Sequence, residues 1–257
     1  GDVHGFIAGW TYWVSNLVYF PFALLFSAGI FLHVGGDRWL AHAGDGSYNL
    51  LYCLTVLWAA TGLGILGLEH AKWLQNIGGI ATWSAAVLIL VAGTLAAYHF
   101  GAATAITTTN VLPDFSKLAT FSTFATMALA FQGLELGLIL GGEIKNPSRQ
   151  IPRATLISCV VIAAIYIAGT ASLLIALPTS TIDVIAGIPQ ALAAIGERIG
   201  LPMFGALTAA LVTIGTIGSI SAWVTGTARL PFVVGVDRYL PAALGRLHPR
   251  YGTPHVA

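Results

Sequence analysis

Long apolar runs separated by short polar segments set the pattern of this chain. Each run approaches or exceeds the roughly 20 residues that a helix needs to cross the hydrocarbon core of a membrane. Helix-breaking residues such as Gly, Pro and Asp fill the intervals between the runs. The pattern predicts six membrane-spanning helices in one transmembrane domain over residues 1–257, at about 6–32, 50–68, 77–99, 121–141, 154–177 and 204–234.

The composition fits this all-α polytopic membrane helical bundle. Hydrophobic residues make up 56% of the chain and charged residues 8%, whereas soluble domains carry roughly 25% charged residues. A soluble enzyme is therefore excluded. The zinc-binding, nucleophile-elbow and phosphate-loop motifs are absent from the sequence, so no catalytic residue, cofactor or metal site is predicted. With a net charge of +1 and no basic tract, we expect no nucleic-acid partner.

Lys and Arg counts predict the orientation, because they set the topology of membrane proteins. Eight of the eleven lie on the side that holds both ends of the chain, so both ends are expected in the cytoplasm. The outer loop 178–202 carries apolar residues at near-helical spacing, which suits either an external lid or a segment resting on the surface. Without an initiating Met, the chain is expected to be an internal part of a longer protein.

The fourth run carries the most informative residues. Gly133 and the acid Glu135 lie well inside it, and both are costly in a continuous membrane helix. We expect Phe131, Gln132 and Gly133 to form an unwound elbow whose free N–H groups attract a carboxylate, as at transporter binding sites. The alternative for Gly133 is a packing notch. Glu135 is expected to serve a proton-linked gate or a substrate amine, or else to bond a hydroxyl of a neighbouring helix.

Two other spans carry candidate binding residues. In the first, Tyr12 and Asn16 share one helical face, which suits a cavity for an amphipathic solute; the alternative is an interfacial aromatic belt with a helix–helix hydrogen bond from Asn16. In the sixth, Ser219 and Trp223 lie among small residues. Trp223 is predicted to be a plug or gate, or alternatively to face lipid.

The polar segment after the fourth run is bracketed by prolines. Asn146-Pro147 disfavours helix, and Pro152 suits the first turn of the fifth span. It is predicted either to be a hinge that couples the fourth span to the scaffold or to be only a tight turn. The hinge residues are Glu143, Lys145, Asn146, Pro147, Arg149, Pro152 and Arg153.

Three motifs together resemble the amino acid–polyamine–organocation (APC) permeases. Residues 131–135 followed by 142–154 (GEIKNPSRQIPRA) are similar to the sixth helix and next loop of that family. Residues 5–13 (GFIAGWTYW) look like the start of its third helix. Residues 229–254, with RLPF, DRYLP and HPRYGTP, look like the end of its eighth helix and the following loop.

The resemblance implies a LeuT-like fold with two inverted five-helix repeats, of which this chain would hold helices three to eight. In that family the amino and carboxyl groups of the substrate meet broken helices one and six, and aromatics from helices three, six and eight close over it. The matching positions here are Tyr12, Asn16, Phe131, Gln132, Gly133, Glu135, Ser219 and Trp223. Gln132 is more polar than the branched aliphatic residue usual there, and it is expected to reach a substrate side chain.

These observations predict a secondary active transporter of amino acids in the cytoplasmic membrane, surrounded by lipid and working by symport or exchange. One alternative is a polyamine or other organic-cation permease of the same fold. The other is a membrane sensor that binds a solute without transporting it. Which amino acid is moved, the coupling ion and the oligomeric state stay open.

Overall fold

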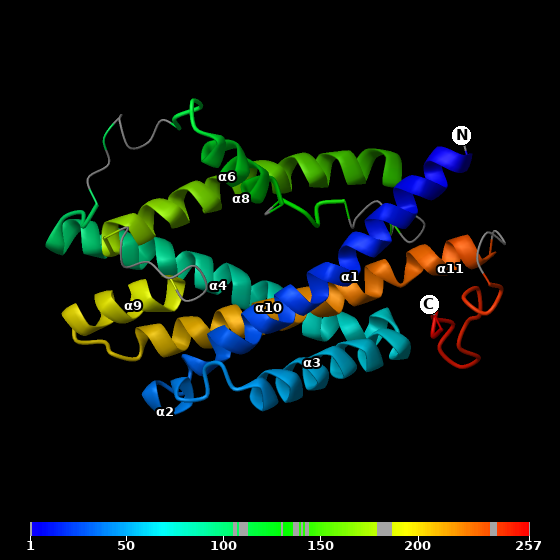
Figure 1. Cartoon of the computed structure of the whole chain (residues 1–257), viewed down its shortest axis with the longest axis horizontal. Coiled ribbons are helices and arrows are strands. Elements are labelled where there is room, and N and C mark those ends of the chain that lie inside the picture. Colours follow the sequence, from blue (N-terminus) through cyan, green and yellow to red (C-terminus); the bar gives the residue numbers. More distant parts are fainter. Residues whose placement is uncertain are drawn as a thin grey trace. The chain divides into compact units, whose positions relative to one another are not determined.

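The computed structural model describes residues 2–104, 107, 113–129, 131–135, 139, 141, 144–178, 187–236 and 241–256 (Figure 1). Within these ranges the regular structure is helical, apart from one isolated bridge between Leu247 and Pro254. Five helical stretches in the described ranges are long and apolar enough to cross a membrane. The chain is thus an all-α polytopic membrane protein. These stretches are Val3–Leu32, Gly46–Leu66, Leu68–Phe100, Pro147–Ala176 and Phe204–Phe232.

The helices begin earlier than the apolar pattern predicts. Helix α3 (Gly46–Leu66) starts four residues before the expected position, α4 (Leu68–Phe100) nine before, and α8 (Pro147–Ala176) seven before. These added turns contain polar residues. Where a helix projects beyond the lipid, water can hydrogen-bond these side chains and the unpaired backbone groups of the helix end. At α3 the Asp45 carboxylate accepts a hydrogen bond from the Ser47 N–H at 2.9 Å, a helix-capping contact.

The chain divides into two compact units, of which the first comprises Gly1–Leu88 and Asp183–Ala257. It holds α1 (Asp2–Leu32), the short α2 (Asp37–Leu40), α3, the first part of α4, and the C-terminal helices. Helix α10 (Phe204–Thr227) lies at its centre and packs against α1 and α3 (Figure 1). Their shared core contains Ala23, Leu24, Ala60 and Ile220.

Helix α9 (Gly187–Arg198) is docked tightly on the start of α10. A Cβ added to Gly205 would stand 2.7 Å from the Ala193 Cβ and 3.1 Å from the Pro189 carbonyl oxygen. Such close approach leaves no room for a side chain at Gly205. The described part of the predicted outer loop therefore rests on its neighbour, and residues 179–186 of that loop lie outside the described residues.

The C-terminal segment folds back onto α3 in the same unit. After α11 (Arg229–Val236), the described residues 241–256 form a loop in which the His248 N–H donates to the Thr253 carbonyl at 2.8 Å. The Thr253 hydroxyl donates to the carbonyl of Ile65, one of the last residues of α3. The last four carbonyls of a helix lack helical partners, so Thr253 satisfies one of them.

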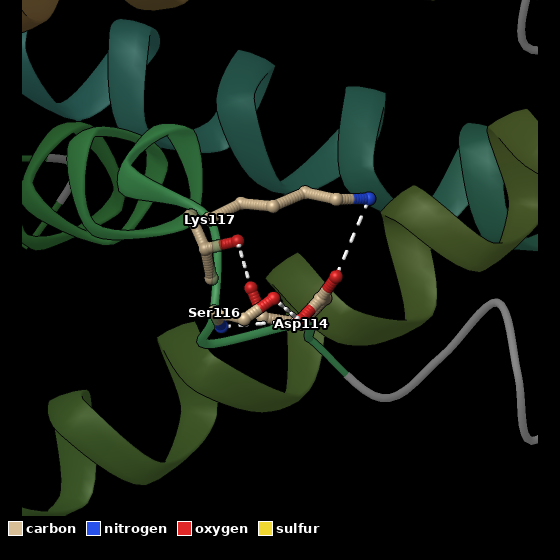
Figure 2. A network of polar contacts seen from close by, with 4 residues as sticks. Asp114, Ser116 and Lys117 are labelled. Carbon is tan, nitrogen blue, oxygen red and sulfur yellow. Dashed lines mark hydrogen bonds and ion pairs between the residues drawn. The ribbon is translucent and has the colours of Figure 1, made fainter.

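The second unit, Ile89–Ile182, contains the rest of α4, helix α6 (Leu118–Leu129) and α8. A Cβ added to Gly93 of α4 would stand 2.3 Å from the Ser172 Cβ of α8, so these two helices touch closely. Before α6, the Asp114 carboxylate accepts hydrogen bonds from the Ser116 hydroxyl and N–H and pairs with Lys117 at 3.3 Å (Figure 2). These contacts hold the turn that leads into α6.

Candidate functional site

The fourth apolar run is interrupted where the sequence predicts an elbow. Helix α6 ends at Leu129, and residues 131–135 form turns. Gly133 has a φ of 110°, a backbone conformation that residues with a Cβ rarely adopt. The predicted helix over 121–141 is therefore broken among its described residues. Residues 136–138, 140, 142 and 143, including the predicted hinge residue Glu143, lie outside them.

The Glu135 carboxylate bonds the elbow itself. Its Oε2 accepts a hydrogen bond from the Gly133 N–H at 2.9 Å, and both residues are half-buried. A helix that breaks inside a membrane must find partners for its freed backbone groups. In this structure the carboxylate of Glu135, two residues along the chain, provides such a partner for the Gly133 N–H.

An aromatic contact fixes the start of the elbow against α8. The Phe131 ring meets the Tyr166 ring edge-on, with centroids 5.4 Å apart. Sequence reasoning did not select Tyr166, although it is the lone aromatic residue in the apolar run 154–177. Gln132 follows Phe131 in the same turn and is half-buried.

Asn16 of α1 is buried and carries an unsatisfied acceptor. The residue is 1% exposed. Its Nδ2 donates to the Tyr12 carbonyl at 2.7 Å within the helix, and its Oδ1 has no hydrogen-bond partner among the residues that the structure describes. A buried polar atom without a partner is costly. Among the described residues, Asn16 thus makes no hydrogen bond to another helix, and its unsatisfied oxygen is suited to a donor from a ligand.

Trp223 of α10 packs against the same helix α1. It is 4% exposed, and its ring lies 4.9 Å from the Tyr19 ring, centroid to centroid. The lipid-facing alternative for Trp223 is therefore excluded. Sequence reasoning placed Tyr19 in the cluster of aromatic and polar residues of the first span but did not select it as a binding residue, although it follows Asn16 by three residues and so lies near it on the helix. Tyr12 is half-buried one turn before Asn16.

Ser219 does not join this contact. It is exposed, whereas Ser221, two residues later, is fully buried, and its hydroxyl has no hydrogen-bond partner in the described part of the chain. The helix turns by about 200° over two residues, so the two serines face nearly opposite ways. The prediction selected the serine on the uncovered side of α10. Asn16 and Trp223 belong to the first unit, and the elbow belongs to the second.

The predicted hinge is shorter than expected. Helix α8 begins at Pro147, so Pro147, Arg149, Pro152 and Arg153 are already helical. Pro147 takes the first helical position, where a missing N–H costs nothing, and Asn146 before it adopts the left-handed conformation with φ 52°. Pro152 is thus inside the helix and does not begin it. Lys145, Arg149 and Arg153 are exposed.

A comparison with protein families decides the class of this chain. The family model described as "Amino acid permease" matches residues 1–257. The chain belongs to the amino acid permease family. The expected resemblance is confirmed, and the protein is a multi-pass membrane transporter homologue.

Individual relatives of this permease are described as transporters. An uncharacterized transporter of Legionella pneumophila is 29% identical over 97% of this chain and 53% of its own length. A glutamate/gamma-aminobutyrate antiporter of Lactococcus lactis is 24% identical over 95% and 49%. The serine/threonine exchanger SteT of Bacillus subtilis is 26% identical over 100% and 56%. The chain spans about half the length of these curated relatives.

Proposed function

We propose that this permease is a secondary active transporter that moves amino acids across the cytoplasmic membrane by alternating access, through proton symport or amino acid exchange. The observation that carries the proposal is the break at Gly133 inside a membrane-length apolar run, with the Glu135 carboxylate on the freed N–H. A broken helix at membrane depth is tolerated where it serves a binding site.

The substrate carboxylate and the proton would both act on one hydrogen bond of the elbow, the bond between Gly133 and Glu135. The N–H of Gly133 is bonded at 2.9 Å to an internal carboxylate, so a substrate carboxylate would have to share or replace that partner. Protonation of Glu135 makes its carboxyl group a weaker hydrogen-bond acceptor. The Gly133 N–H is then free to bond the substrate carboxylate. Proton uptake and substrate binding would then favour each other, which is the coupling that symport requires.

Within the first unit, taken by itself, two residues offer groups suited to a solute. The unsatisfied Oδ1 of Asn16 is an acceptor for an ammonium or for a donor on the substrate side chain. Trp223, held beside Tyr19, is the aromatic group that would close over a bound solute. Tyr12 and Gln132 are proposed to contact the substrate side chain, and Ser219 is proposed as a substrate contact in the complete protein.

Orientation and the hinge complete the proposal. We propose that both chain ends face the cytoplasm, because eight of the eleven Lys and Arg residues lie on their side. Ile144, Lys145 and Asn146 are the described residues between the fourth run and α8, and the left-handed backbone of Asn146 sets the direction in which the chain enters α8. We propose that this connection transmits motion from the broken helix to α8.

Two other functions stay testable. A polyamine permease would need several acids in its cavity, whereas Glu135 is the acid found in the candidate binding residues. A sensor would bind the solute without moving it. An uptake experiment with the full-length protein in proteoliposomes distinguishes the three functions. Uptake of radiolabelled amino acids and of polyamines is measured into vesicles with and without unlabelled amino acid inside.

Glu135→Gln sharpens this experiment, with Glu197→Gln on the exposed face of α9 as the matched control. We expect amino acid uptake by the wild type, loss of its pH dependence in Glu135→Gln with binding retained, and no change in the control. Uptake of polyamines alone, or solute binding with no uptake or exchange at any pH, would reject the proposed function.

A further inference from the structure

Within the described residues, one face of α8 is uncovered along most of its length. Arg149, Arg153, Leu156, Val160 and Ile167 follow each other in steps of four, three, four and seven residues, which keeps them on one side of a helix. All five are exposed, and the three apolar side chains expose 68%, 64% and 73% of their surface. A different side of α8 carries Ser172, which packs on Gly93 of α4.

The face is apolar along the helix and cationic at one end. The two arginines lie one turn apart in the first two turns of α8, and exposed Lys145 precedes them by one further step of four residues. The first turn of α8 holds no acidic residue. Among the described residues, no ion-pair or hydrogen-bond partner is found for the guanidinium group of either arginine, although the backbone N–H of Arg149 donates to the Asn146 carbonyl at 3.1 Å. The positive charge at this end of the face is therefore uncompensated within the described part of the chain.

We propose that this face binds an anionic phospholipid, with its phosphate held by Arg149 and Arg153 and an acyl chain lying along Leu156, Val160 and Ile167. In a helix that crosses the membrane, arginine stems extend along apolar surface and place their guanidinium groups at headgroup level. Guanidinium groups hold phosphate through paired N–H donors. The order of the side chains, cationic at the helix end and apolar inward, matches the order of headgroup and acyl chain in a lipid.

This inference does not depend on which solute the permease moves. It concerns a helix of the second unit and uses none of the residues proposed to contact substrate. Cationic residues near a membrane surface gain about fivefold in affinity per charge for anionic lipid, so two arginines would make a measurable difference.

The test titrates the full-length protein in detergent with phosphatidylglycerol or phosphatidylcholine and follows its melting temperature. We expect phosphatidylglycerol to raise the melting temperature at lower concentration than phosphatidylcholine. Arg149→Gln combined with Arg153→Gln should weaken that apparent affinity about 25-fold, from about fivefold for each arginine. Arg38→Gln is the control, because Arg38 is exposed on the four-residue α2, and it should leave the affinity unchanged.

Arg149→Lys combined with Arg153→Lys keeps the charge and should retain most of the preference, which guards against a folding defect in the glutamine variant. Glycerol phosphate, which has the headgroup anion without acyl chains, should not reproduce the stabilisation. The proposal is overturned if the wild type shows no preference between the lipids, if the glutamine and wild-type proteins behave alike, if Arg38→Gln has the same effect, or if glycerol phosphate suffices.

Discussion

Gly78 of α4 and Gly218 of α10 lie so close that a Cβ added to either would stand 2.6 Å from the Cα of the other. The Cβ on Gly218 would also lie 3.0 Å from the Leu74 carbonyl oxygen. The obstructing atoms are backbone, so they cannot rotate away as a side chain could. Membrane helices associate through such small residues because lipid offers them no hydrophobic driving force. This contact fixes α4 against α10 in the first unit.

Alanine at either glycine should force the two helices apart. We expect Gly218→Ala to reduce the free energy of unfolding by about 1–3 kcal/mol, the usual cost of overpacking. Thermal melting of the detergent-solubilised full-length protein measures the change. Gly79→Ala is the control, because nothing lies within 4 Å of a Cβ there, and equal melting temperatures for the two variants would contradict the close contact.

Asn16→Ala separates binding from stability. The Asn16 Oδ1 makes no hydrogen bond to any described residue, so removing it takes away no observed interaction of that atom. The lost Nδ2 bond to Tyr12 costs about 1 kcal/mol. We expect substrate affinity in proteoliposome uptake to fall at least about tenfold, equivalent to about 1.4 kcal/mol. Ser15→Ala removes an exposed hydroxyl that bonds the same Tyr12 carbonyl. Equal losses in both variants would argue against a binding role for Asn16.

Gln132→Leu should change selectivity more than stability. A half-buried amide in the elbow can bond a polar substrate side chain, and such a bond contributes about 0.5–1.5 kcal/mol. Competition of threonine and valine for uptake compares two side chains of similar shape. We expect the ratio of their affinities to move toward valine by a few-fold to about tenfold. Gln150→Leu, at an exposed position of α8, should leave the ratio unaltered, and an unaltered ratio in Gln132→Leu would remove the proposed contact.

The stability of the turn before α6 is expected to depend on pH through the carboxyl group of Asp114. Hydrogen bonds from the Ser116 hydroxyl and N–H, together with Lys117, lower the pKa of its carboxyl from the ordinary value of 3.8. The folded pKa lies below the unfolded one, so the carboxylate stabilises the turn fully above the ordinary pKa. That contribution is lost as the pH falls through the lowered pKa.

Hydrogen exchange of the amides of residues 114–120, corrected for intrinsic rates, measures this loss. Protection should hold from neutral pH to about pH 4 and decline below it in the wild type. The Asp114→Asn variant should be less protected and flat with pH, and Ser116→Ala should move the decline upward. A wild-type profile that matches Asp114→Asn would show that the carboxylate does not hold the turn.

Thr253→Val tests the attachment of the C-terminal loop to α3. The variant keeps the shape of the side chain and removes the hydroxyl that donates to the Ile65 carbonyl. We expect a loss of about 1 kcal/mol and faster proteolysis within residues 241–256. Thr55→Val is the control, since the Thr55 hydroxyl bonds a carbonyl of its own helix. Unchanged proteolysis of Thr253→Val would mean that this bond does not retain the loop.

The break in the fourth run could be predicted because its causes are local. A glycine and an acid inside a membrane-length apolar run are unfavourable in a continuous helix, and Gly133 tolerates the left-handed backbone that the turn requires. The starts of α3, α4 and α8 could not be predicted from apolar runs. A helix continues past the lipid wherever water and capping side chains satisfy its backbone, and hydropathy carries little information about that.

The sequence by itself determined the class of the protein, the number of apolar runs and the place of the interruption, because each follows from neighbouring residues and the thickness of a bilayer. Only the tertiary structure decided that Ser221 is buried and Ser219 exposed, that Tyr19 meets Trp223, and that α9 docks on α10. Helical periodicity fixes which residues share a face. Which face is covered depends on a partner helix far away in the chain, and no local pattern specifies that partner.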